Sequence, residues 1–190
     1  WYPGAGLYRN VHLRINNPVH IPVWGTQLVT PVVNKDFAKV NLKTRLDAGM
    51  PNSVGYRIIT EIKDKDGRII DHGEKLLEYG DENVFEQNFI VKSPLLWSPD
   101  TPDLYKAYSR IYSGQILLDE HVTTFGIRSL EFIPDKGFFL NGEKTYFKGV
   151  CIHHDSGPLG SAVNDAAIRR QIRIMKEMGC NAIRTSHNMP

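Results

Sequence analysis

The 190-residue sequence contains little cysteine. Its two cysteines, Cys151 and Cys180, form neither a CxxC pair nor a spacing typical of zinc ligands, which excludes a cysteine-based zinc module. Each flanks an expected strand, where a free thiol usually acts as a small apolar side chain. We therefore interpret both as buried free cysteines, and they leave the redox compartment undecided.

The sequence also lacks a charge bias and a long apolar run. Its 23 lysines and arginines against 21 acidic residues form no stripe or basic tail, which excludes an electrostatic nucleic-acid binder. No apolar stretch approaches the length of a membrane span, and no signal-peptide pattern opens the chain, so we expect no membrane partner. The length suits one substantial domain and part of another.

Between residue 7 and about residue 128 the sequence is typical of short strands. Apolar and polar residues alternate along these segments, as they do in half-buried strands. Turn chemistry separates several of them, for example at Gly67 and at Ser113-Gly114. The pattern predicts a mainly β fold, an immunoglobulin-like antiparallel β-sandwich. The expected strands are 11–15, 40–46, 56–62, a return strand beginning at 69–70, 84–91, 105–112 and 116–125.

Three prolines interrupt this rhythm between residues 94 and 102. Because proline cannot donate to a strand ladder, we predict a loop or an edge crossover there. Trp97 in this segment has two interpretations. It could be a platform on which a sugar stacks, but packing of the loop onto the sandwich is the favoured one, since large aromatic side chains most often serve burial.

Beyond residue 128 the pattern changes to that of an α/β unit. Asn141-Gly142 predicts a type I′ hairpin, and a strand is expected at 146–150. After a loop at 151–163, a helix is predicted over 165–178, capped by Asn164 and ended by Gly179, with a last strand at 180–184. The helix carries an apolar stripe. Strand, helix and strand then form a right-handed βαβ unit with parallel strands. The stripe consists of Ile168, Ile172, Met175 and Met178.

Polar residues follow both expected strands of this unit. In a parallel pair the two carboxyl ends share one edge of the sheet, where barrels and open sheets bind ligands. The residues are His153, His154, Asp155, Arg184, Ser186 and His187. A metal site is disfavoured because adjacent His153 and His154 diverge on extended backbone and no second carboxylate is suitably spaced. A Ser-His-Asp triad lacks a nucleophile elbow. Loop residues that satisfy backbone groups remain the alternative to a ligand site.

Six segments, in order, resemble landmarks of one enzyme family. They are Gly6 to Val11, Leu96 to Tyr105, Phe125 to Arg128, Phe139 to Lys144, Lys148 to Val150, and Asn181 to His187, the last similar to an N-x-(I/V)-R-x-S-H signature. On these motifs the chain resembles, over essentially its whole length, glycoside hydrolase family 2, the family of β-galactosidases, β-glucuronidases and β-mannosidases. The HHD and SHN variants look most like β-galactosidases. Cys151-Ile152 and Asn188-Met189-Pro190 depart from the commoner family residues.

The resemblance implies a domain order and roles for three residues. Residues 1–16 would end an N-terminal sugar-binding jelly roll, 17–128 would form the immunoglobulin-like sandwich, and 129–190 would begin a truncated (β/α)8 TIM barrel, as a hairpin plus one βαβ unit. His153 and His187 would bind sugar hydroxyls, and Arg184 would orient the catalytic carboxylates. These contacts suit a retaining glycosidase, whose transition state gains positive charge on the sugar ring.

The resemblance also implies what this chain lacks. Both catalytic glutamates of the retaining exo-β-glycosidase would lie beyond Pro190, so we predict that the fragment itself is inactive. It should hold no metal or cofactor, although the full-length enzyme could bind a divalent cation or Na+. The expected partner is a β-linked galactoside or related glycan, in a homo-oligomer and in a periplasmic or extracellular location. The alternative is a noncatalytic carbohydrate-binding or adhesive sandwich. Because a truncated barrel exposes apolar surface, we also predict self-association or high mobility beyond Gly149.

Overall fold

The computed structural model describes residues 7, 10–48, 55–78, 82–153, 156–162 and 164–185. Their contacts divide them into two compact units. The sandwich unit comprises residues 15–144, and the βαβ unit comprises residues 1–14 together with 145–190.

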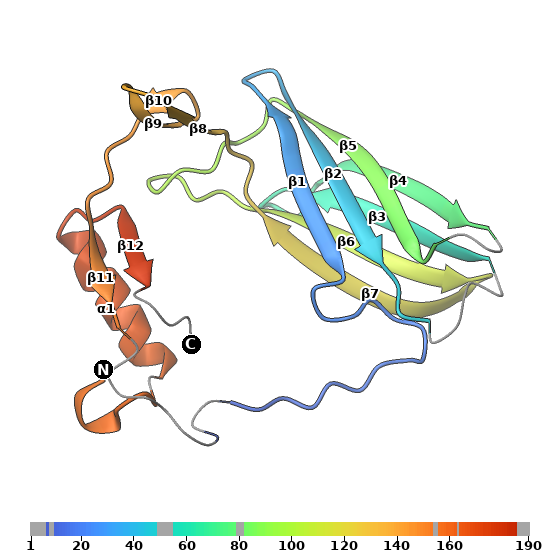
Figure 1. Cartoon of the computed structure of the whole chain (residues 1–190). Helices are drawn as coiled ribbons and strands as arrows, with labels where there is room; N and C mark the ends of the chain where they lie inside the picture. Colours follow the sequence, from blue (N-terminus) through green and yellow to red (C-terminus); the bar gives the residue numbers. More distant parts are fainter. Residues whose placement is uncertain are drawn as a thin grey trace. The chain divides into compact units, whose positions relative to one another are not determined.

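Besides a small sheet formed by residues 130–144, the sandwich unit contains two antiparallel sheets (Figure 1). One sheet has the order β1-β2-β5 and the other the order β4-β3-β6-β7. This arrangement confirms the expected antiparallel sandwich and its mainly β character. The strands are β1 (Thr26–Val33), β2 (Phe37–Arg45), β3 (Tyr56–Lys63), β4 (Ile69–Leu77), β5 (Val84–Lys92), β6 (Tyr105–Ser113) and β7 (Ile116–Phe125).

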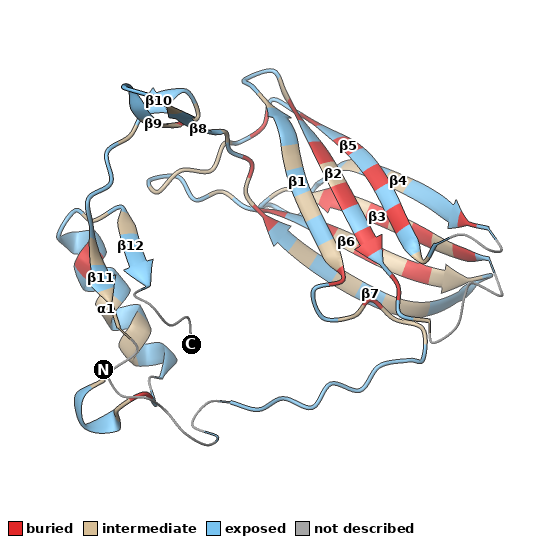
Figure 2. Cartoon of the chain, in the orientation of Figure 1, coloured by how far each residue is buried: buried red, intermediate tan, exposed pale blue. Residues whose placement is uncertain are grey.

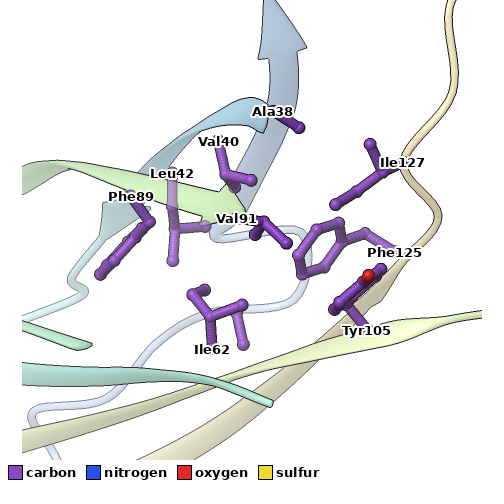
Figure 3. Close-up of a cluster of buried hydrophobic side chains, with 10 residues drawn as sticks. Ala38, Val40, Leu42, Ile62, Phe89, Val91, Tyr105, Phe125 and Ile127 are labelled. Carbon is purple, nitrogen blue, oxygen red and sulfur yellow. The ribbon is translucent and has the colours of Figure 1, made fainter. Parts of the chain in front are cut away.

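The core of the sandwich follows from strict alternation in the sequence. Every second residue of β2 and of β5 is buried, and the residues between them are exposed or half-buried (Figure 2). Figure 3 shows a cluster in which buried side chains of β2 and β5 meet those of the other sheet, where Tyr105 and Phe125 stack with ring centroids 5.7 Å apart. The Tyr105 hydroxyl accepts a hydrogen bond of 2.8 Å from the Leu95 amide, and burial raises the pKa of this phenol. The core therefore fixes the proline-rich loop as well as the sheets.

A small polar cluster bridges the two sheets inside this core. The Thr60 hydroxyl donates to Gln87 Oε1 at 2.7 Å and lies 3.2 Å from the Ser109 hydroxyl. Gln87 Nε2 donates in turn to the carbonyl oxygen of Gly73 at 3.2 Å. Because buried polar groups are costly unless they are hydrogen-bonded, these mutual bonds let polar residues occupy inward positions of β3, β5 and β6.

Strand β1 was not among the predicted strands. Pro31 lies inside it, and a proline normally argues against a strand because it removes a ladder donor. The structure resolves this in two ways: β1 is an edge strand, and its pairing with β2 is interrupted between Val29 and Val32. Proline is tolerated at such edges and bulges.

The predicted strand at 11–15 is wrong. Residues 10–17 adopt no regular secondary structure, and Val11, Leu13 and Ile15 are exposed. Alternation makes a strand only where a neighbouring strand accepts and donates backbone hydrogen bonds. Among the described residues no strand pairs with this segment.

The hairpin near the end of the sandwich unit confirms the Asn141-Gly142 prediction. Strand β8 (Leu130–Ile133) pairs with β9 (Gly137–Leu140), and β9 pairs with β10 (Glu143–Lys144) through Asn141 and Gly142. Both turn residues have positive φ, 53° and 81°, as a type I′ turn requires. The Asn141 side chain also accepts from the Ser129 amide and donates to the Trp97 carbonyl, each at 3.0 Å.

Trp97 packs onto the sandwich unit, as the favoured interpretation expects. The Arg128 guanidinium lies over its indole at 4.6 Å. A Cβ at Gly126 would lie 3.0 Å from Trp97 Cβ, tighter than an ordinary van der Waals contact, so the glycine leaves room for the indole. Half-buried Trp97 therefore serves to fix the loop against the residues that follow β7.

The βαβ unit matches the expected order of elements. Strand β11 (Gly149–Ile152) and β12 (Ala182–Thr185) are parallel, and a 3-10 turn (Gly157–Leu159) and helix α1 (Asp165–Glu177) lie between them in sequence. The Asn164 side chain caps α1 by accepting from the Ala167 amide at 2.9 Å, and Gly179 takes a φ of 85° after the helix. Strand β11 begins three residues later than the predicted 146–150. At 13 residues α1 is too short to span a membrane, and no other helix among the described residues could do so.

Candidate functional site

The parallel pairing of β11 and β12 brings predicted site residues to one edge of a sheet. Gly149 lies opposite Ala182, Cys151 opposite Arg184, and Ile152 opposite Thr185. Both strands therefore end at the same level, and His153 follows β11 directly. The carboxyl edge of a parallel pair is where α/β folds bind ligands.

Arg184 and Cys151 share one face of this two-stranded sheet. Directly paired residues of parallel strands point to the same side, and Arg184 Nη1 lies 3.8 Å from Cys151 Sγ in a long N–H···S hydrogen bond. Cys151 is exposed and Cys180 is half-buried, so the expectation that both cysteines are buried is wrong for Cys151 and only partly met by Cys180. Alternation places Val150 and Ile152 on the opposite face of the pair, so the exposure of Cys151 depends on which face the rest of the fold covers.

Asn181 fixes the start of β12 against the segment that precedes β11. Its side-chain oxygen accepts from the Lys148 amide at 2.8 Å, and its side-chain nitrogen donates to the Tyr146 carbonyl at 2.9 Å. Its own amide donates to the Lys148 carbonyl at 2.9 Å. One asparagine thereby satisfies three backbone groups and determines how β12 aligns with β11.

Gly149 is required for the same alignment. A Cβ at this position would collide with the carbonyl oxygen of Ala182, which is backbone and cannot move aside. Close approach of two backbones is one reason for a glycine in a strand. Gly149 and Asn181, at the start of the two strands, therefore fix the register that places Cys151 beside Arg184.

His153 lies at a cavity between β11 and α1. The cavity has a volume of about 380 Å³ and is lined by Cys151, Ile152 and His153 from the strand and by Gln171, Ile174 and Met175 from the helix. His153 is half-buried there. Arg184 is not among the lining residues, so the geometry joins it to Cys151 rather than to this cavity.

Four of the predicted edge residues, His154, Asp155, Ser186 and His187, lie outside the described residues. A pocket shared by His153 and His187 therefore stays a prediction. Within the described part of the chain, no group of three histidine, cysteine or acidic side chains is arranged to hold a metal ion.

Two residues that make contacts around this pair of strands were not among the predicted site residues. Cys151 was interpreted as a buried apolar residue, and Asn181 only as part of a motif. Both contacts follow from the strand pairing: Asn181 precedes β12 and accepts from the Lys148 amide before β11, and Cys151 pairs with Arg184. The alternation of residues along a strand shows which side chains share a face of the sheet, but only the fold shows which residue of the neighbouring strand each one pairs with.

Sequence comparison shows what the chain is similar to. The profile "Glycosyl hydrolases family 2" matches residues 19–128, and the profile "Glycosyl hydrolases family 2, TIM barrel domain" matches residues 132–189. Beta-galactosidase BoGH2A of Bacteroides ovatus is 42% identical over 194 residues, which cover 100% of this chain and 23% of that protein. A beta-glucuronidase of Bacteroides fragilis is 31% identical, over 96% of this chain and 27% of that protein.

Solved structures agree with these matches. The crystal structure of a glycosyl hydrolase family 2 member from Bacteroides cellulosilyticus has a TM-score of 0.92 to this chain at 38% identity, covering 100% of this chain and 26% of that one. The chain thus spans about a quarter of the length of the relatives it matches.

Proposed function

The chain belongs to glycosyl hydrolases family 2, and we propose that the polypeptide that carries it hydrolyses β-linked glycosides, β-galactosides first, with retention of configuration. The observation that supports this most directly is the edge of the β11–β12 pair. There Arg184 is held on one face, and His153 follows the neighbouring strand. A charged guanidinium and an imidazole at the carboxyl edge of barrel strands suit recognition of a hydroxyl-rich substrate and its carboxylate catalysts.

In this proposal each residue has a distinct role. His153, together with His187, hydrogen-bonds sugar hydroxyls, and such bonds strengthen as positive charge develops on the ring. Arg184 orients a catalytic carboxylate, since a guanidinium presents several N–H donors in a fixed plane that matches a carboxylate. None of the three transfers a proton or attacks the sugar.

The two reacting carboxyl groups come from outside this chain in our proposal. Retaining hydrolysis needs an acid/base and a nucleophile about 5–5.5 Å apart. The carboxylates described in the βαβ unit, Asp165 and Glu177, are both part of α1 rather than of the strand edge. We therefore propose that later barrel strands, beyond Pro190, supply both glutamates and that the 190 residues alone are inactive.

Which sugar the substrate carries is the part of the proposal that the comparisons constrain least. The relative with 42% identity is named a beta-galactosidase, whereas a relative with 31% identity is named a beta-glucuronidase. A β-glucuronide is accordingly the second candidate substrate. Its carboxylate needs a cationic partner, so the two candidates differ in the charge that the site must accept.

The test compares the longer polypeptide that contains this chain with the 190 residues alone. Both are assayed on aryl β-galactoside, β-glucuronide and β-mannoside, with aryl α-galactoside as the control for linkage. We expect β-galactoside turnover by the longer polypeptide only. Turnover by the 190 residues that survives repurification would contradict the proposed inactivity.

The noncatalytic alternative gives a different outcome. A longer polypeptide that is folded and retained on immobilised glycan, but cleaves none of the substrates, would favour a carbohydrate-binding or adhesive protein. The sequence downstream of Pro190 provides an independent check, because the enzyme requires an Asn-Glu pair and a second glutamate at later strand ends.

A further inference from the structure

Cys151 contacts the one cation that the proposed function places beside the catalytic carboxylates. From this contact we propose that Cys151 is a positioning residue, whose sulfur holds the Arg184 guanidinium on the substrate-facing side of the β11–β12 pair. The inference rests on the proposed glycosidase function. It concerns how Arg184 is held and leaves the roles of the reacting groups unchanged.

The geometry of the contact is set by the backbone. Cys151 and Arg184 are direct register partners, and their side chains meet across the strands at 3.8 Å between Sγ and Nη1. Gly149 and Asn181 fix that register two and three residues earlier along the strands, by close approach and by three hydrogen bonds. The sulfur is thus presented to the guanidinium by a rigid frame.

The chemistry of sulfur suits a positioning role. A thiol is a weak acceptor, so it can orient one N–H of the guanidinium without neutralising its charge. Among the residues that the structure describes, no carboxylate forms an ion pair with Arg184, which is exposed. In the proposal, its remaining donors and its charge therefore serve a carboxylate of the complete barrel.

A carboxylate in place of the thiol would have the opposite effect. It would form an ion pair with Arg184 and compete with the catalytic carboxylates for the same donors. An alanine would leave Arg184 unrestrained, because the long side chain would regain its rotamers. The three side chains therefore predict three different kinetic results.

The kinetic test uses the longer polypeptide and the variants Cys151→Ser, Cys151→Ala and Cys151→Asp. We expect Ser to stay close to the parent, since it keeps an acceptor, and Ala to lower kcat/KM about fivefold to tenfold, the loss of one weak hydrogen bond to a charged group. Cys151→Asp should lower kcat/KM further than Cys151→Ala does. The control is Val150→Ala, a truncation in the same strand on the opposite face, at a residue that does not line the cavity beside His153.

The pH profile separates positioning from packing. A guanidinium near a carboxylate favours its charged form and lowers its pKa. If Arg184 is released in Cys151→Ala, the pKa of the nucleophile rises, and the acidic limb of kcat/KM moves to higher pH. Val150→Ala should leave this limb in place. An unchanged limb in Cys151→Ala, or the same shift in Val150→Ala, would overturn the proposal.

A second measurement does not depend on turnover. Iodoacetamide reacts with the thiolate, which is a minor form of an ordinary thiol at neutral pH, and a neighbouring guanidinium increases that minor fraction. Peptide mass mapping gives the alkylation rate of each cysteine. We expect Cys151 to be alkylated faster than Cys180. In Arg184→Gln the rate at Cys151 should fall severalfold, whereas the rate at Cys180 should not change. Equal Cys151 rates in the parent and in Arg184→Gln would refute the contact. An inactive polypeptide with the expected alkylation pattern would contradict the proposed function but not the contact.

Discussion

The two units bury their apolar residues to very different extents. In the sandwich unit Phe85, Phe89 and Ile111 are at most 2% exposed, because two sheets cover each other's inner faces. In the βαβ unit Ile172 is 46% exposed and Met178 69%, although both belong to a regular helical stripe. Equally regular sequence patterns therefore produce a closed core in one unit and half-covered faces in the other.

The difference has a physical origin in the two architectures. An antiparallel sandwich of about 110 residues contains both of its layers, so the alternation of its strands finds a partner face within the same unit. A βαβ unit is one repeat of a layered barrel, and its strands are covered on both faces only when further repeats are present. The stripe of α1 indicates where cover is expected, and only Met175 of that stripe is buried among the described residues.

The largest expected effect tests this contrast directly. Phe89→Ala should lower the free energy of unfolding by about 3–5 kcal/mol, because it removes a large buried ring and leaves a cavity. Ile172→Ala should cost about 1 kcal/mol or less, since half of that side chain already meets water and alanine favours the helix. Urea unfolding followed by circular dichroism measures both changes.

A matched control comes from the same strand. Ile90, next to Phe89 in β5, is 49% exposed on the outer face. Ile90→Ala should lower the free energy of unfolding far less than Phe89→Ala does, although both changes truncate a large apolar side chain. A loss in Ile172→Ala as large as that in Phe89→Ala would show that the βαβ unit has a core of its own.

The same contrast explains what could be predicted from the sequence. Six of the sandwich strands were predicted because alternation alone determines which side chains face the core. Strand β1 was missed because Pro31 within it argued against a strand, although a proline is tolerated in an edge strand. The strand at 11–15 was wrongly predicted because alternation does not show whether another strand pairs with the segment. The family was also predicted and is confirmed by both profile matches.

The candidate site could be predicted only in part. His153 and Arg184 were expected at one edge because parallel strands end together, and the structure confirms the parallel pairing, whereas their role in binding substrate stays a prediction. The contact of Cys151 with Arg184 could not be predicted, since it depends on which residues of two strands become partners across 33 positions of sequence. The exposure of a thiol likewise depends on which face the rest of the fold covers.

A smaller effect should appear within the βαβ unit. Asn181→Ala removes the side-chain bonds to Lys148 and Tyr146, whereas Asn181→Asp keeps the acceptor for the Lys148 amide and loses the donor. Because a hydrogen bond contributes about 1 kcal/mol, the Lys148 amide should exchange with deuterium about fivefold faster in the alanine variant. In the aspartate variant it should stay near the parent rate.

The Leu95 amide is the control for this measurement, because it donates to Tyr105 inside the sandwich unit. Its exchange should not respond to either Asn181 variant. Unchanged exchange of Lys148 in Asn181→Ala would mean that other contacts hold the two strands in register.

The smallest effect concerns the surface of the sandwich rather than its core. A hydrogen bond from Lys63, together with the positive charges of Lys63 and Arg110, holds the pKa of Glu61 below its usual value, although partial burial works against this. The Glu61 carboxylate lies 3.0 Å from Lys63 Nζ and 3.3 Å from Arg110 Nη1. Such partly exposed ion pairs contribute about 0.5 kcal/mol.

The sign of the pH dependence follows from the lowered pKa of Glu61. A carboxyl group whose pKa is lower in the folded state stabilises the fold above its unfolded pKa of about 4.3, and this stabilisation is lost as the pH falls through the folded value. The parent should therefore exceed Glu61→Gln in stability at pH 7 and lose that advantage in acid or at high salt, where surface charges are screened.

Glu82→Gln, at an exposed position outside the ion-pair network, is the control. A difference between parent and Glu61→Gln that stays constant from pH 7 to strongly acidic conditions would assign the effect to side-chain packing. In that case the outer surface of the sheet would contribute to stability through contact, as the core does, rather than through charge.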